Sequence, residues 1–122
     1  MSLRSLFYVF AFLAAGCNIQ STEVGTSYVY ESSGYKQCEN NSSSINVSAQ
    51  KLVSEGINVT SKQCGELTQT AMISVCGAPT ADINILAIAQ VDTDKALTLG
   101  FLELSSLKKD SEDDGYIIKE CL

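Results

Sequence analysis

Five cysteines carry most of the reactive chemistry that this 122-residue sequence offers. Cys17 directly follows an apolar N-terminal run, and the other four are Cys38, Cys64, Cys76 and Cys121. No Cys-x-x-Cys pair occurs, which disfavours a zinc site and thioredoxin-like redox chemistry. Four cysteines in a small exported domain indicate two disulfides instead. Three pairings are open, and we prefer Cys64–Cys76 across a hairpin together with Cys38–Cys121 closing nearly the whole domain.

Histidine is absent from the sequence, which removes the commonest general base near neutral pH. Neither a Ser-His-Asp nor a Cys-His nucleophile can be assembled, and a zinc site with imidazole ligands is excluded. Asp82, Asp92 and Asp94 flank a predicted strand, but capping and the helix dipole explain Asp92 and Asp94 at a helix start. The sequence also holds no glycine-rich phosphate loop. We therefore expect a protein that is not an enzyme and needs no cofactor.

An acidic stretch near the C-terminus is the one candidate metal site. Asp110, Glu112 and Asp114 alternate ahead of Gly115, which resembles the first part of an EF-hand calcium loop. The resemblance implies oxygen ligands from these three side chains. Cys121, however, stands where the EF-hand has its bidentate glutamate. We favour a solvated acidic turn, with a weak Ca²⁺ site as the alternative.

The N-terminal residues have the pattern of an export signal. Arg4 is the only charged side chain before Cys17, and residues 6–15 form an unbroken apolar run. A helix of this length spans about 15 Å, half the hydrocarbon thickness of a bilayer, and is too short to cross a membrane. The length suits the middle region of a signal peptide, and the small residues 14–16 suit its cleavage site.

The string from Leu13 to Cys17, Leu-Ala-Ala-Gly-Cys, resembles the lipobox of bacterial lipoproteins. The resemblance implies that residues 1–16 are removed as a signal peptide, that the Cys17 thiol carries diacylglycerol and that the new amine receives a further acyl chain such as palmitate. Two or three chains anchor a protein durably. Ala14 stands where leucine is usual, and Asn18 implies sorting to the outer membrane, facing the periplasm. The other interpretation is an ordinary secretory signal cut near Gly16, which would leave Cys17 as an unpaired thiol.

Charge is divided unevenly between the signal and the rest of the chain. Residues 17–26 are polar and are predicted to be a tether, and residues 27–122 a single domain. From Cys17 onward the sequence holds 8 − 1 = 7 basic and 14 acidic residues, a net charge of −7. Such a field repels phosphate backbones and anionic lipids. We therefore expect no nucleic-acid partner, and a membrane contact made through the lipid on Cys17 alone.

Hydrophobic periodicity predicts strands alternating with helices along the domain. An amphipathic helix is expected where Ile45, Ala49, Leu52 and Val53 have helical spacing, with Ser44 or Asn46 as its cap and Gly56 after its last turn. A short helix is expected from Asp92 or Thr93 to 99. Residues 83–91 are apolar on both faces and predict a central strand. The other expected β segments are 28–35, 57–61, a β-rich run at 71–76, 102–105 and an edge strand at 116–120.

Residues 52–61 and 96–105 repeat one plan, in which a helix end is followed by a glycine, a large apolar residue and an alternating strand. Gly56 and Gly100 hold the equivalent position. Strand–helix–strand twice over is the layout of a split βαβ or ferredoxin-like sandwich. We therefore predict a disulfide-stabilised α+β fold with one mostly antiparallel sheet and two helices on one face.

The combination of an anchor, a small domain and no catalytic equipment favours an accessory protein of the bacterial envelope. We expect it to bind another envelope component. A small-ligand or Ca²⁺-binding sensor domain is the alternative. Tyr28, Tyr30 and Tyr35 could supply an aromatic binding face, although core packing is the commoner explanation for such tyrosines.

Overall fold

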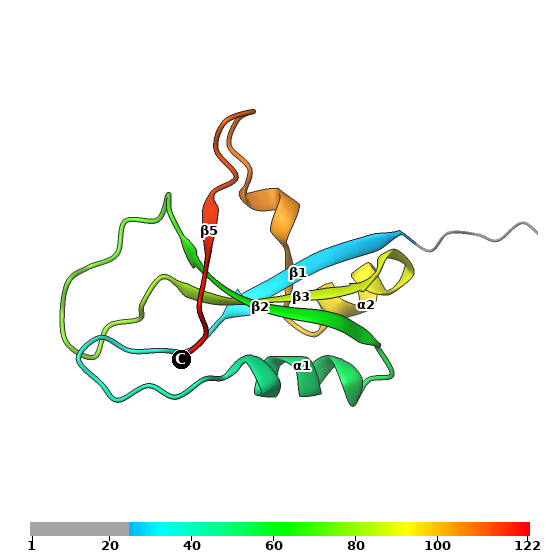
Figure 1. The fold of residues 1–122 in the computed structure, drawn as a ribbon, viewed down its shortest axis with the longest axis horizontal. Helices are drawn as coiled ribbons and strands as arrows, with labels where there is room; N and C mark the ends of the chain where they lie inside the picture. The colour runs from blue at the N-terminus through cyan, green and yellow to red at the C-terminus, as the bar shows by residue number, and fades with distance from the viewer. Residues whose placement is uncertain (1–24) are drawn as a thin grey trace, which may run out of the picture.

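The computed structural model describes residues 25–122, so Cys17 and the predicted signal peptide lie outside the described residues. The described chain forms five strands, two α-helices and two short 3-10 helices (Figure 1). In chain order they are β1 (Thr26–Ser32), α1 (Ile45–Val53), β2 (Val59–Leu67), β3 (Asp82–Ala89), η1 (Gln90–Asp92), α2 (Thr93–Thr98), β4 (Leu102–Glu103), η2 (Leu104–Leu107) and β5 (Tyr116–Lys119). Within residues 25–122, no helix has both the length and the apolar character needed to cross a membrane.

All five strands join one antiparallel sheet in the order β4-β1-β3-β2-β5. The passages β1–α1–β2 and β3–α2–β4 each return to the sheet with a strand of the other passage in between, which is the split βαβ arrangement. The predicted α+β class is confirmed. β3 is the middle strand, and its residues from Ile83 to Ile88 are all buried, as their apolar pattern predicted. The predicted edge strand is confirmed as β5.

Both α-helices cover the same face of the sheet. Ile45 and Leu52 of α1 and Ala96 of α2 pack into one cluster with Val29 of β1 and Leu86 of β3. The predicted amphipathic helix is confirmed as α1, which begins at Ile45 and ends at Val53. Its apolar residues recur every three to four positions, so one side of the helix is apolar and packs against the sheet.

The predicted repeat is confirmed in the backbone where each helix ends. Gly56 and Gly100 both have positive φ, 81° and 98°. After Gly56, the Ile57 N–H donates to the Leu52 carbonyl at 3.0 Å, and after Gly100 the N–H of Phe101 makes the equivalent bond. This is the Schellman termination, in which a left-handed residue lets the next apolar side chain fold back onto the helix. Ile57 and Phe101 are both buried in the core.

The opposite face of the sheet is covered by the chain that crosses it from β4 to β5. Leu104 of η2 packs there against Tyr30, Ile83 and Ile85. The predicted strand at 102–105 is therefore wrong beyond Glu103, where β4 ends. At Leu104 the chain turns into η2 instead of continuing as an edge strand, because the Leu104 side chain is buried against this second face of the sheet.

The disulfides join Cys38 to Cys76 and Cys64 to Cys121, so the preferred pairing is wrong although the number of bridges is right. β2 continues through Cys64 and pairs with β5, where Lys119 lies opposite Cys64 and brings Cys121 close.

The predicted β-rich run at 71–76 forms no strand, and this is why the hairpin pairing fails. The run lies in the connection between β2 and β3. Cys76 there meets Cys38 in the connection between β1 and α1 instead of facing β2.

Candidate functional site

The connection between β2 and β3 projects from one end of the sheet and is fastened to the connection between β1 and α1 (Figure 1). The Cys38–Cys76 disulfide joins the two covalently. Two backbone hydrogen bonds of 2.9 Å link Gln37 to the residues just after Cys76. The side-chain amide of Gln37 also donates to the Ile73 carbonyl at 2.7 Å. We call residues 71–79 the braced loop.

The braced loop exposes apolar side chains although its backbone is held in place. Met72, Ile73 and Val75 are exposed, Ile73 by 75% of its surface. No charged residue occurs between positions 68 and 81 in a chain of net charge −6. An apolar, uncharged patch rimmed by polar surface is typical of a protein-binding site.

The braced loop lies at the end of the domain opposite to the start of β1. At that start, the Gly25 carbonyl accepts a hydrogen bond of 2.7 Å from the Gln90 N–H, beside η1 and α2. β1 then runs for seven residues, about 23 Å, toward the end where β2 and β3 are connected (Figure 1). Any segment that precedes Gly25 therefore enters the domain far from Ile73.

A groove of about 360 Å³ lies on the sheet face opposite the two α-helices. It opens between the first half of β1 and the chain that crosses from η2 to β5. Its polar lining includes two tyrosines, two serines, a lysine and an aspartate, namely Tyr28, Tyr116, Ser27, Ser105, Lys108 and Asp114. Clefts that bind small molecules begin at about 300 Å³.

The acidic stretch forms a turn in which two of its carboxylates accept hydrogen bonds from the backbone. Asp110 accepts a hydrogen bond from the Glu112 N–H, and Asp113 accepts one from the Gly115 N–H, both at 2.8 Å. Within residues 25–122, no group of three or more His, Cys, Asp or Glu side chains is arranged to hold a metal ion. The predicted set of Asp110, Glu112 and Asp114 is thus not brought together, and Asp114 lines the groove instead.

Asp82 is the first residue of β3 and lies in an ion-pair cluster with residues of β2 and β5. Lys119 of β5 donates to its carboxylate at 2.5 Å, and the Lys119 ammonium lies 3.8 Å from Glu66. Burial alone would raise the pKa of Asp82, but hydrogen bonds from Lys119 and Thr80 outweigh it and hold that pKa below its ordinary value. The hydrogen bond to Asp82 raises the pKa of Lys119.

The other two aspartates of the predicted set lie at the opposite end of β3. Asp92 and Asp94 flank the start of α2, and the seven strand residues that follow Asp82, about 23 Å in length, separate them from it. No pair of carboxylates for acid–base chemistry forms between the two ends. Asp92 occupies the N-cap position of α2 and Ser44 that of α1, as predicted, but neither side chain makes a capping hydrogen bond.

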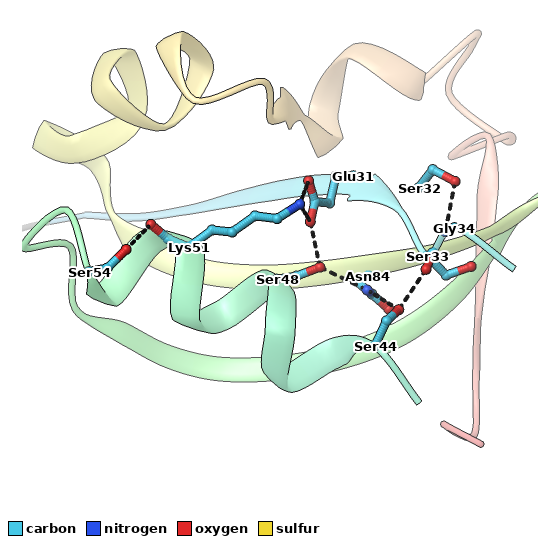
Figure 2. A network of polar contacts seen from close by, with 9 residues as sticks. All are labelled: Glu31, Ser32, Ser33, Gly34, Ser44, Ser48, Lys51, Ser54 and Asn84. Atoms are coloured by element: carbon cyan, nitrogen blue, oxygen red, sulfur yellow. Dashed lines mark hydrogen bonds and ion pairs between the residues drawn. The ribbon is translucent and has the colours of Figure 1, made fainter. Parts of the chain in front are cut away.

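A buried polar network joins α1 to the sheet (Figure 2). The amide nitrogen of Asn84 donates to the hydroxyls of Ser44 and Ser48, at 2.9 and 2.8 Å. Ser48 in turn donates to Glu31 at 2.6 Å, and Lys51 forms an ion pair with the same carboxylate at 2.9 Å. These bonds fix the rotation of α1 against β1 and β3.

Sequence reasoning missed this network. Two signals point to it. Asn84 is the one polar residue within the apolar run 83–89, and Ser48, on the buried side of α1, follows the N-cap Ser44 by four residues. Asn84 and Ser48 are almost fully buried. The network is therefore a structural element rather than a ligand site.

The three tyrosines predicted as an aromatic face have different roles. Tyr30 and Tyr35 are buried, and the Tyr35 hydroxyl accepts a hydrogen bond of 3.3 Å from the Ser44 N–H. Only Tyr28 remains substantially exposed, with 47% of its surface open, and it lines the groove. Core packing thus explains two of the three tyrosines.

Comparisons with known proteins return no match to a family model, to a curated protein or to a solved structure. The predicted attachment residue Cys17 lies outside the described residues. Two surface features of the described residues, the braced loop and the groove, are candidates for binding.

Proposed function

We propose that this protein is a lipid-anchored accessory domain of the bacterial envelope that binds another envelope protein through the braced loop. The observation that carries the proposal is the exposure of Met72, Ile73 and Val75 on a loop whose backbone is fixed by a disulfide. The lipobox resemblance of residues 13–17 and the absence of histidine support an anchored, non-catalytic role.

The geometry of the braced loop suits binding. Complete burial of one aliphatic side chain contributes about 1.5–3 kcal/mol, so three neighbouring ones can anchor a modest interface. Ordering a flexible loop on binding would oppose this gain. The Cys38–Cys76 bridge and the bonds of Gln37 order the loop in the free protein, which reduces that opposing term.

The position of the loop is consistent with an anchor at Cys17. The eight residues 18–25 reach at most about 28 Å from the lipid. Such a tether would join the domain at the start of β1, so the braced loop at the opposite end is free to point away from the membrane into the periplasm. A partner with an apolar pocket and a basic rim fits best, because the loop itself is uncharged and the surrounding domain is acidic.

Site-directed photocrosslinking tests the proposal. A photoreactive residue in place of Ile73 should capture one envelope protein in intact cells, whereas the same residue in place of Val91 should not. Val91 is the matched control because it is 80% exposed and lies in η1 at the opposite end. With the captured protein purified, Ile73→Ser should weaken binding at least about tenfold, a loss of about 1.4 kcal/mol, and Val91→Ser should leave it unchanged.

The lipid anchor and the contact through the braced loop can each be disproved without the other. Cys17→Ser should release the protein from the membrane fraction, and intact mass spectrometry of the parent should show the acyl chains. A variant that still fractionates with membranes would exclude the anchor. Equal binding of the purified partner by the Ile73→Ser protein would exclude the braced loop as the contact.

A further inference from the structure

The groove between β1 and the crossover carries a set of polar side chains that the fold itself does not use. The side chains of Lys108 and Asp114 form no ion pair or hydrogen bond with any residue in the described range 25–122. The hydroxyls of Tyr28 and Tyr116 likewise have no partner there. Neighbouring carboxylates differ, since Asp110 and Asp113 each accept a backbone N–H. The Glu112 side chain likewise has no partner within residues 25–122, but of these four acidic residues only Asp114 lines the groove.

Tyr28 presents ring surface as well as a hydroxyl to the groove, whereas the Tyr116 ring is partly buried against the core cluster that contains Leu104. Tyr28 and Tyr30 share a face of β1, but Leu104 covers Tyr30 and leaves Tyr28 open. Tyr116 lines the groove from the start of β5. Exposed tyrosine rings offer a flat apolar surface next to a hydrogen-bonding group.

The charges of the groove exclude several ligand classes. A single lysine within an acidic protein does not make a phosphate site, and neither α1 nor α2 contributes an N-terminus to this face. A purely apolar ligand would desolvate Lys108 and Asp114 without replacing their bonds to water, which is unfavourable.

We infer that this groove is a carbohydrate-binding site that takes one or two sugar rings. A pyranose ring has one apolar C–H face that stacks on tyrosine and a rim of hydroxyls that both donate and accept hydrogen bonds. Lys108 donates to such hydroxyls, Asp114 accepts from them, and Ser27 and Ser105 do both. The volume of about 360 Å³ suits a ligand of this size. This inference goes beyond the proposed function and does not depend on the braced loop.

Saturation-transfer NMR on the full-length protein in detergent micelles tests the inference. The probes are free glucose, galactose, N-acetylglucosamine and their β-linked disaccharides, added at millimolar concentrations. At least one should receive saturation on its ring C–H protons, with dissociation constants in the millimolar range that are usual for a shallow groove. Tyr28→Ala should weaken this binding at least about tenfold, and Lys108→Met or Asp114→Asn several-fold.

Matched controls come from the adjacent residues. Lys109→Met and Glu112→Gln change the same charges outside the groove lining and should leave sugar binding unchanged. A thermal melt of each variant separates loss of binding from loss of folding, and Tyr28→Phe supplies a second, more conservative variant. Ile73→Ser should also bind sugar as the parent does, which keeps this test independent of the partner test.

Three results would overturn the inference. They are the absence of saturation on every sugar, equal binding by Tyr28→Ala, and equal losses for the groove variants and their controls. If the protons of an unrelated tripeptide mixture receive saturation, if the groove variants abolish this signal, and if no sugar receives any, the groove binds peptides instead.

Discussion

Lys119 lies between two carboxylates at the free edge of β5, and its bond to Asp82 ties the last strand to the middle strand of the sheet. The ammonium is partly exposed, so solvent screens the pair and its contribution to stability is modest, about 0.5–1 kcal/mol. Because β5 has only four residues, even this contribution bears on whether the strand stays in place.

The pKa shifts of this pair set two pH limits. The pKa of Asp82 is lowered in the folded protein, so its stabilisation is complete above the pKa of an unfolded aspartate, about 4, and is lost as pH falls through the lower folded value. The pKa of Lys119 is raised, so its share is complete below about pH 10 and is lost as pH rises through the folded value.

Lys119→Met should therefore lower the free energy of unfolding by about 0.5–1 kcal/mol at neutral pH. The difference between parent and variant should shrink below about pH 4, as Asp82 becomes protonated. Urea unfolding across the acid range measures this, with Lys109→Met as the control for general charge effects. A difference that stays constant down to pH 2, or grows, would mean that the pair does not act as described.

At the scale of elements, five glycines of the described residues 25–122 have positive φ and end helices or turns, but they do so in different surroundings. An added Cβ at Gly56 would meet nothing within 4 Å. At Gly115, which closes the acidic turn, an added Cβ would lie 2.2 Å from the Leu107 carbonyl oxygen. A side chain at position 56 is therefore disfavoured by the backbone conformation alone. A side chain at position 115 is disfavoured by the backbone conformation and also by the close approach of Leu107.

Gly56→Ala should cost about 1–2 kcal/mol, the strain of a left-handed alanine. Gly115→Ala should cost about 2–5 kcal/mol, because the Leu107 backbone must also move. Gly77→Ala, at an equally open site, serves as a second reference for strain alone. Chemical denaturation of the three variants ranks them, and equal losses at positions 56 and 115 would contradict the packing argument.

The predicted elements hold where local pattern and tertiary packing agree. α1 was predictable because its apolar residues keep helical spacing up to a glycine, and β3 because an unbroken apolar run must be buried on both faces. Residues 71–76 have the same β-rich composition, yet no strand of the sheet accepts them. Strand pairing is a long-range event, so composition alone did not reveal that this run is exposed.

The candidate sites were less predictable than the fold, for a related reason. The groove joins Tyr28 to Lys108, Asp114 and Tyr116 across some ninety positions of sequence, and only the crossover over the second sheet face places them together. Similarly, four cysteines predict two bridges by number, whereas the pairing depends on which connections meet at one end of the sheet.

For the whole molecule, the two disulfides close loops of similar size but hold different parts. Their sequence separations are 38 and 57 residues. In the chain-entropy model each bridge contributes about 4 kcal/mol, a large share of the stability of a domain this small. The Cys64–Cys121 bridge joins the core side of β2 to the end of β5, whereas Cys38–Cys76 joins two surface connections. The bridges therefore differ less in energy than in which structure they hold.

Removing each bridge separately should expose this difference. With Cys38→Ser and Cys76→Ser, hydrogen exchange should increase in residues 33–44 and 68–81 while the sheet stays protected, and partner binding through the braced loop should weaken because the free loop is no longer ordered. With Cys64→Ser and Cys121→Ser, exchange should increase in β5 and the end of β2, and the groove should lose Tyr116 and with it sugar binding. Each variant acts as the control for the other, because the expected entropic loss is nearly the same. If both variants lose protection in the same residues, the molecule unfolds as one unit. In that case the two bridges do not separately hold the braced loop and the groove.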